Sequence, residues 1–168
     1  MKTSAEKLLK EKLFKLEELA AERAKWKAEG KKVVFTNGVF DLLHIGHLSY
    51  LSAAADLGHK LIIGLNSDAS TKRLKGPSRP VNNEYSRSVM LAAIFFIDAV
   101  VIFEEDTPIN VIKTLLPDIL IKGGDYSINQ IVGAPEVIAN GGEVKVIDFV
   151  DGYSSTGIIN KIKEAKSS

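Results

Sequence analysis

The 168-residue chain contains no cysteine. This absence excludes a disulfide framework and catalysis by a thiol, and it fits a reducing compartment. The sequence also lacks an apolar run long enough to cross a membrane, and the segment that follows Met1 has no apolar core typical of a signal peptide. Its formal net charge is only +1, which gives no general case for nucleic-acid binding. We therefore expect a cytoplasmic protein that binds neither membranes nor nucleic acids.

The first 30 residues differ in charge from the rest of the chain. Before Val33 there are ten Lys or Arg and six Asp or Glu, a net charge of +4, which leaves −3 for the remainder. Apolar residues recur there with helical spacing, at Leu9, Leu13, Leu16 and Ala20. This spacing predicts one long amphipathic helix over residues 1–30, followed by a single domain over residues 31–168. The helix either packs on its own domain or forms a contact in a homodimer or higher homo-oligomer.

From residue 31 onward, apolar strands alternate with helical patterns. The expected strands are Val33–Phe35, Lys60–Leu65, Ala99–Phe103, Asp118–Lys122 and Val144–Asp148. The expected helices follow Gly46, run from Glu84 to Phe96, start at Thr107-Pro108, span Pro135–Asn140 and span Ser154–Ala165. This alternation predicts an α/β fold, a Rossmann-like doubly wound parallel five-stranded sheet with an N-terminal helix. Ligands of such sheets bind at the carboxyl ends of the strands, and polar residues cluster after these strands.

Segment 33–47 has the pattern of a buried strand, a tight turn and the first turn of a helix. Such a helix start directs free backbone N–H groups and the positive end of the helix dipole to one place, which suits a phosphate. His44 and His47 lie there, and Gly46 allows close approach of a ligand. Both imidazoles can donate hydrogen bonds to phosphate oxygens on which charge develops during nucleotidyl transfer. The alternatives are ordinary loop and cap residues, or a zinc pair, for which only His59 remains as a further imidazole.

The densest basic stretch outside the N-terminal segment comprises Lys72, Arg73, Lys75, Arg79 and Arg87. Gly76, Pro77 and Pro80 lie in its middle and predict a loop. A mobile cationic loop can close over a triphosphate and shield the reaction from water. The alternative is a solvated surface loop.

The motif Lys122-Gly123-Gly124-Asp125 follows a predicted strand. Its glycines permit a positive φ and close approach of a ligand. Asp125 can accept hydrogen bonds from sugar hydroxyls, and Lys122 can bind a phosphate. The alternative is a plain glycine turn.

Two other polar positions have both a structural and a functional interpretation. Segment 154–156 (Ser-Ser-Thr) offers hydroxyls and free N–H groups at a helix start, which either cap the helix, bind an anion, or do both. Asp41 either holds a loop or binds sugar hydroxyls. A carboxylate there repels a triphosphate unless Mg²⁺ lies between them.

The run Thr36-Asn37-Gly38-Val39-Phe40-Asp41, followed by His44-Ile45-Gly46-His47, resembles the nucleotidyltransferase superfamily that carries the H-x-G-H signature. The likeness extends over about residues 31–163. Three further stretches, 66–76, 103–108 and 121–126, resemble one branch, the D-glycero-β-D-manno-heptose 1-phosphate adenylyltransferases. H-x-G-H alone indicates only the superfamily, whereas the combination is more specific.

The resemblance implies transfer of AMP from ATP, with Mg²⁺, to a sugar 1-phosphate, which gives ADP-heptose for the lipopolysaccharide core and pyrophosphate. In many relatives this domain is fused to a sugar kinase. The present sequence shows no such domain, so we expect a separate kinase to supply the heptose 1-phosphate. No protein ligand to a metal is assigned. The implied catalytic residues are His44, His47, Lys75 and Arg87. The nucleotide-binding residues are Thr36, Asn37, Gly38, Phe40, His44, Gly46, His47, Lys122, Gly124, Asp125, Ser154, Ser155 and Thr156. The substrate-binding residues are Asp41, Asn66, Asp68 and Lys75.

Two other functions fit the same residues. The first is a cytidylyltransferase acting on glycerol 3-phosphate or a similar small phosphate, because the base is read largely by backbone groups that the sequence does not reveal. The second is a regulatory module that binds a nucleotide without catalysis. The intact His44, Gly46 and His47 speak against the regulatory module.

Overall fold

The computed structural model describes residues 4–124, 126–148 and 152–165, so the predicted site residue Asp125 lies outside the described residues. The strands are β1 (Leu13–Phe14), β2 (Val33–Gly38), β3 (Lys60–Asn66), β4 (Ala99–Phe103), β5 (Ile119–Gly123) and β6 (Glu143–Ile147). The α-helices are α1 (Ala5–Lys10), α2 (Leu16–Ala28), α3 (Ile45–Ala55), α4 (Asp68–Lys75), α5 (Glu84–Ala92), α6 (Ile109–Leu115), α7 (Ala134–Ala139) and α8 (Ser155–Ala165). A 3₁₀ helix, η1, spans Ile128–Gln130.

The strands form one sheet in the order β1-β4-β3-β2-β5-β6, and every neighbouring pair is parallel. The predicted doubly wound parallel sheet is therefore confirmed, but the predicted number of five strands is wrong. The sixth strand is β1, whose Leu13 and Phe14 pair with Val100 and Val101. Two residues are too few to show the alternation of a strand, and their partner lies far away in the sequence.

The N-terminal segment is not the single long helix that its leucine spacing predicted. It forms α1 and α2 with β1 between them. Leu19 and Trp26 of α2 are buried in the core, and buried Arg23 forms an ion pair of 2.9 Å with Asp118. Asp118 also accepts a hydrogen bond from the backbone N–H of Val33 at 2.7 Å. The segment thus packs on its own domain, and a contact between subunits through it stays a prediction.

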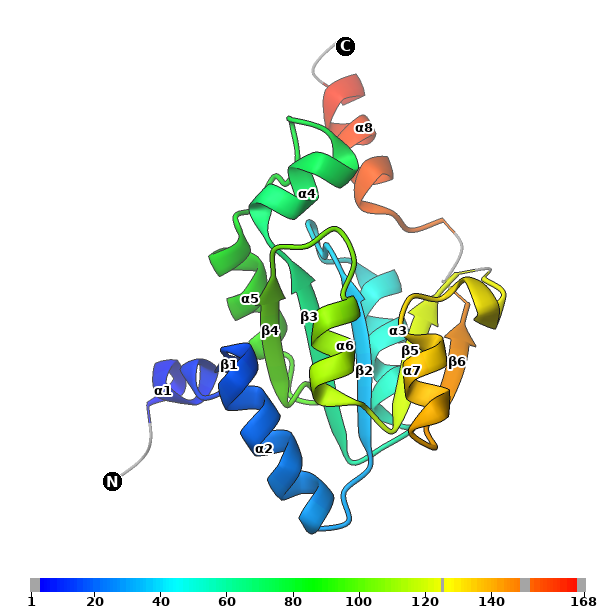
Figure 1. The fold of residues 1–168 in the computed structure, drawn as a ribbon. Coiled ribbons are helices and arrows are strands. Elements are labelled where there is room, and N and C mark those ends of the chain that lie inside the picture. Colours follow the sequence, from blue (N-terminus) through cyan, green and yellow to red (C-terminus); the bar gives the residue numbers. More distant parts are fainter. Residues whose placement is uncertain (1–3, 125, 149–151, 166–168) are drawn as a thin grey trace.

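Helices cover both faces of the sheet. Figure 1 shows α2, α6 and α7 on one side and α3 and α5 on the other. Side chains alternate between these two cores: Phe35 and Leu120 pack with the first group of helices, whereas Val34 and Ile121 pack with the second. This alternation decides which side of the sheet the polar residues at the strand ends face.

The basic stretch begins as a helix that was not predicted, whereas its middle, from Gly76 to Pro80, is the predicted loop. Residues 68–75 form α4, capped by the Ser67 hydroxyl, which accepts a hydrogen bond from the backbone N–H of Ser70 at 3.1 Å. The loop starts at Gly76, whose φ of 98° favours glycine. The following helix, α5, ends at Ala92 and not at Phe96. The missed signal for α4 is a serine cap followed by an acidic first turn and a basic last turn.

In the described part of the chain, no helix combines the length and the apolar character needed to cross a membrane.

Candidate active site

A cavity of about 600 Å³ opens at the carboxyl ends of the central strands. It is formed by the β2–α3 turn, the last turn of α4, residues 106–108, the end of β5, residues 130–132 and the start of α8. The predicted site residues that line it are Asn37, Gly38, Phe40, Asp41, His44, Gly46, His47, Asn66, Lys75, Lys122, Ser154, Ser155 and Thr156. Its position agrees with the rule for parallel sheets. Thr36, Asp68, Arg87 and Gly124 are not part of its lining.

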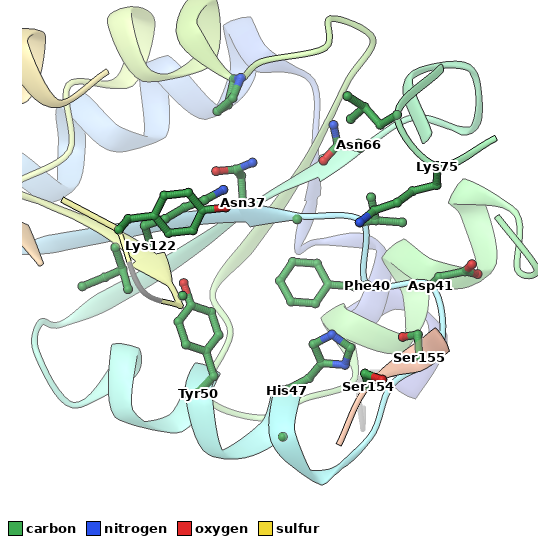
Figure 2. A pocket seen from close by; sticks show the side chains of 18 of the residues that line it. Asn37, Phe40, Asp41, His47, Tyr50, Asn66, Lys75, Lys122, Ser154 and Ser155 are labelled. Atoms are coloured by element: carbon green, nitrogen blue, oxygen red, sulfur yellow. The ribbon is translucent and has the colours of Figure 1, made fainter. Parts of the chain in front are cut away.

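The two signature histidines form a stacked pair at the start of α3. Their ring centroids are 3.9 Å apart with an interplanar angle of 24°. The ring of Phe40 lies 5.2 Å from that of His47 and supports it from the side (Figure 2). A Cβ at Gly46 would lie 3.1 Å from the ring of His44, so only glycine leaves this arrangement undisturbed. The local fold thus places both imidazoles at one end of the cavity.

Burial keeps both imidazoles neutral at pH 7. It lowers the pKa of His44, and burial together with the neighbouring charge of His44 lowers the pKa of His47 to about 4. The Nδ1 atoms of both rings are buried and have no hydrogen-bond partner in the described part of the protein. Buried polar atoms normally have a partner, so these two Nδ1 atoms are exceptions within the described part of the protein.

The start of α8 adds backbone and hydroxyl groups to the same end of the cavity. The Ser154 hydroxyl accepts a hydrogen bond from the Gly157 backbone N–H at 2.9 Å, which confirms the predicted helix cap. The Ser155 hydroxyl donates to the backbone carbonyl of Leu42 at 3.0 Å, and so fixes α8 against the turn before α3. Two helix N-termini therefore converge on the imidazoles, an arrangement that favours negative charge.

Arg87 is not brought to the cavity. Its side chain is fully buried, and it donates to Asp68 Oδ1 at 2.7 Å and to three backbone carbonyls. These are the carbonyls of Val39 at 2.7 Å, Asn66 at 2.9 Å and Asn82 at 2.9 Å. The guanidinium therefore joins the ends of β2 and β3 to the loop before α5, and Asp68 is its counter-ion.

Asp41 is buried at the edge of the cavity and is already bonded to the loop before α5. It forms an ion pair with Arg79 and accepts hydrogen bonds from the backbone N–H groups of Val81 at 2.8 Å and Asn82 at 3.0 Å. Of the two interpretations of Asp41, the structure shows the one in which it holds the loop. The positive charge of Arg79 also offsets the repulsion that Asp41 would exert on a phosphate.

Lys75 and Lys122 approach the cavity from opposite sides (Figure 2). Neither forms an ion pair with a carboxylate of the described residues. Burial, and to a smaller extent the charge of Lys75, lowers the pKa of Lys122. Two cations that face one cavity without counter-ions create a positive potential that attracts an anionic ligand.

Several lining residues were not predicted. They include Tyr50, Asp106, Thr107, Pro108, Tyr126, Gln130, Val132 and Tyr153. Asp106 and Thr107 follow β4, so the rule that sites form at strand ends would have found them. Gln130 ends the short helix η1 and Val132 follows it, and the sequence gives no local signal for either position. The described residues contain no grouping of three His, Asp or Glu side chains placed to hold a metal ion.

Comparison with known proteins identifies relatives of this chain. The family model described as cytidylyltransferase-like matches residues 35–161. The bifunctional protein HldE of Pectobacterium carotovorum is 56% identical over 156 residues, which are 93% of this chain and 31% of that protein. HldE of Campylobacter fetus is 60% identical over 134 residues, 80% of this chain and 28% of that protein. The chain thus spans just under a third of the length of these curated relatives.

Two solved structures share the fold. The lipopolysaccharide core biosynthesis protein from Thermoplasma volcanium is 28% identical with a TM-score of 0.59, over 74% of this chain and 100% of that one. The pantoate-β-alanine ligase from Francisella tularensis is 13% identical with a TM-score of 0.58, over 93% of this chain and 79% of that one. At 13% identity the second likeness concerns the fold alone.

Proposed function

The chain belongs to the cytidylyltransferase-like family, and from this premise we propose that it transfers AMP from ATP to D-glycero-β-D-manno-heptose 1-phosphate. The products are ADP-heptose, for the lipopolysaccharide core, and pyrophosphate. The observation that carries the proposal is the stacked pair His44 and His47, which lines the cavity beside two helix N-termini. The choice of substrate is supported by the resemblance of segments 66–76, 103–108 and 121–126 to heptose adenylyltransferases, and by the identity to HldE.

The reaction joins one phosphate oxygen of the acceptor to the α-phosphorus of ATP, while the bond from that phosphorus to the β-phosphate oxygen breaks. The attacking oxygen already carries negative charge, so no strong general base is required. His44 and His47 donate to oxygens of the α- and β-phosphates, and Lys75 offsets the charge of the departing pyrophosphate. Donors held in place before the reaction stabilise the transition state more than the ground state. Catalysis then rests on alignment and electrostatics.

Mg²⁺ would neutralise part of the triphosphate charge when bound. It commonly binds through substrate phosphates, water and one or two carboxylates. Asp41, the buried carboxylate at the edge of the cavity, is bonded to Arg79 and to two backbone N–H groups. We therefore propose that the ion arrives with ATP and is held mainly by phosphate oxygens. A cytoplasmic location is part of the proposal, because ATP is the donor.

A second candidate is a cytidylyltransferase that uses CTP and glycerol 3-phosphate. The description of the matching family favours it. The stacked histidines and Lys75 would serve both reactions equally, since they act on phosphates and not on the base. Only the identity of the base and of the acceptor separates the two candidates.

The test is pyrophosphate release in Mg²⁺, with ATP or CTP each combined with heptose 1-phosphate or glycerol 3-phosphate. We expect release only with ATP and heptose 1-phosphate. Release with CTP and glycerol 3-phosphate would keep the mechanism and overturn the substrate. If none of the four mixtures released pyrophosphate while ATP still raised the melting temperature, the result would favour a regulatory module without catalysis.

A further inference from the structure

Thr36 and Tyr50 form a buried pair of hydroxyl groups beneath the start of α3. Thr36 Oγ1 lies 2.5 Å from the Tyr50 hydroxyl oxygen, and either group can donate the hydrogen bond. Thr36 is fully buried, and Tyr50 is only 4% exposed. The bond joins β2, which ends at the cavity, to α3, the helix whose first turn carries His47.

The surroundings of this pair are apolar. Thr36 continues the alternation of Val34, so its side chain faces the side of the sheet that α3 covers. There Tyr50 packs in the same core as Val34, Leu51 and Ile63. Apolar contacts depend on buried area and not on direction, so they leave a helix able to shift on its sheet. A hydrogen bond between buried groups fixes both a distance and an orientation, and it thus sets where α3 rests on β2.

The pair also brackets the turn between β2 and α3. Segment 39–44 forms this turn and contains Phe40 and His44. The ring centroids of these two residues lie 5.2 Å and 3.9 Å from that of His47. His47 and Tyr50 are three residues apart on α3, so they share one face of that helix. Figure 2 shows both side chains rising from α3 toward the cavity, which both residues line. A shift of α3 along β2 would therefore displace the imidazole of His47.

The phenol of Tyr50 is suited to hydrogen bonding and not to proton transfer. Burial raises the pKa of Tyr50 to about 12, and the hydrogen bond with Thr36 opposes this effect only in part. The hydroxyl therefore keeps its proton at neutral pH, where a general base must be able to accept one. A residue that lines the cavity and is not a base either binds the ligand or holds another group in place. The bond to buried Thr36, which is not part of the cavity lining, favours the second role.

We propose that the pair formed by Thr36 and Tyr50 positions His47 for catalysis by fixing α3 on β2. Both are positioning residues, because they act through the imidazole and not on the reacting atoms. The resemblance implied that Thr36 binds the nucleotide, whereas its hydroxyl is bonded to Tyr50 outside the cavity lining. This inference rests on the proposed function and deepens it. Nucleotidyl transfer depends on donors that already stand in the right place, and a displacement of about 1 Å can cost about a hundredfold in rate.

The experiment uses the full chain with the double variant Thr36→Val and Tyr50→Phe, which removes both hydroxyls and keeps the shape of both side chains. Removing both partners of a buried hydrogen bond leaves neither hydroxyl of the pair unpaired, so the fold should persist, as circular dichroism would show. The matched control is Thr114→Val with Tyr85→Phe, the same changes at residues outside the cavity lining. A second variant, Thr36→Ser, keeps the hydroxyl and should retain most of the turnover.

Steady-state release of pyrophosphate from ATP and heptose 1-phosphate measures turnover. We expect the double variant to lower kcat about tenfold, less than removal of His47 itself, with KM for ATP nearly unchanged. The single variants Thr36→Val and Tyr50→Phe should each lose about as much as the double variant, because both break the same bond. A tyrosine that bound the ligand independently would add its loss to that of Thr36→Val, and this result would overturn the proposal.

NMR of the ligand-free protein gives a readout that does not depend on the reaction. The imidazole nitrogens of His47 should shift in the double variant, and they should stay in place in the control and in Thr36→Ser. His59, which is not part of the cavity lining, is the internal reference.

A folded double variant with wild-type kcat would overturn the positioning role, as would unmoved signals of His47. An equal loss of turnover in Thr36→Ser and Thr36→Val would overturn it too, because the hydroxyl would then not be the cause. If the double variant did not fold, these two single variants would decide. A wild-type chain that released no pyrophosphate would instead overturn the proposed function, and the signals of His47 would then decide on the pair.

Discussion

The basic residues around the cavity fall into two sets that the sequence does not distinguish. Arg79 and Arg87 are buried or nearly so, and each forms an ion pair with a carboxylate of its own. Lys75 and Lys122 face the cavity, and neither forms an ion pair among the described residues. Lys75, Arg79 and Arg87 belong to one short stretch of sequence. The two arginines are paired with carboxylates of the protein, whereas Lys75 faces the cavity without such a pair. A positive charge near a phosphate site is a candidate ligand only when the protein has not already supplied its partner.

The same comparison assigns the acidic residues. Asp41 and Asp68 were expected to bind substrate, but each is the counter-ion of an arginine. These pairs connect the ends of β2 and β3 to the loop before α5. The paired set therefore shapes the cavity, whereas we propose that the unpaired set and the two histidines bind the ligand.

The largest expected effect is on stability, in Arg87→Met. The change leaves three backbone carbonyls and Asp68 without their donor, and breaking a buried ion pair in this way costs about 3–5 kcal/mol of unfolding free energy. Urea unfolding measures it. The control is Arg73→Met, whose pair with Asp106 is about half exposed and should contribute below about 1 kcal/mol. If Arg87→Met lost turnover but kept its unfolding free energy, Arg87 would act on the substrate. That result would contradict its role in joining the ends of β2 and β3 to the loop before α5.

The next effect is on catalysis, in His44→Ala and His47→Ala. Each removes one donor to the phosphates and should lower turnover by about 10²–10³-fold, the scale for one oxyanion-type donor. Steady-state pyrophosphate release measures it, with circular dichroism to confirm folding. His59→Ala is the matched control, because the His59 ring accepts a hydrogen bond from the Lys32 backbone N–H at 3.0 Å and is not part of the cavity lining. Normal turnover in both signature variants would exclude their proposed role.

A smaller effect is expected for Lys75→Ala. A charge-assisted hydrogen bond to a phosphate contributes roughly 1.5–3 kcal/mol, so kcat/KM for ATP should fall at least about tenfold. Lys72→Ala is the control, since Lys72 lies on the same helix but is not part of the cavity lining. Equal losses in the two variants would indicate a general electrostatic effect and not a contact.

The last effect concerns pH. The pKa of His47 is about 4 in the folded chain, below its ordinary value of 6.5, so between these values the unfolded chain binds a proton that the folded chain does not. Stability should therefore fall as the pH decreases from 6.5 toward 4. Melting temperatures at pH 7 and pH 4.5 should show a smaller loss in His47→Gln than in the wild type. Identical losses would mean that His47 is not held neutral by burial.

The sequence was sufficient for the parts of the fold that depend on local pattern. The five longer strands and the strand-turn-helix that carries His44 and His47 were predicted because buried strands and helix starts leave clear signals. The short strand β1 was missed because it depends on a distant edge, that of β4. Predicted site residues at strand ends, such as Asn37 and Lys122, line the cavity, whereas Asp68 does not. The partners of Arg87 could not be predicted, because they lie on three separate segments that meet only in the folded chain.

The most direct test of the division into paired and unpaired groups is NMR of the side-chain nitrogens during titration with a non-hydrolysable ATP analogue and Mg²⁺. Binding should shift the imidazole nitrogens of His44 and His47, because both residues line the cavity and their rings would donate to phosphate oxygens. The Nε–H signal of Arg87 should stay in place, because it already donates to the Asn82 carbonyl. Shifts at Arg87 with silent histidines would contradict the account.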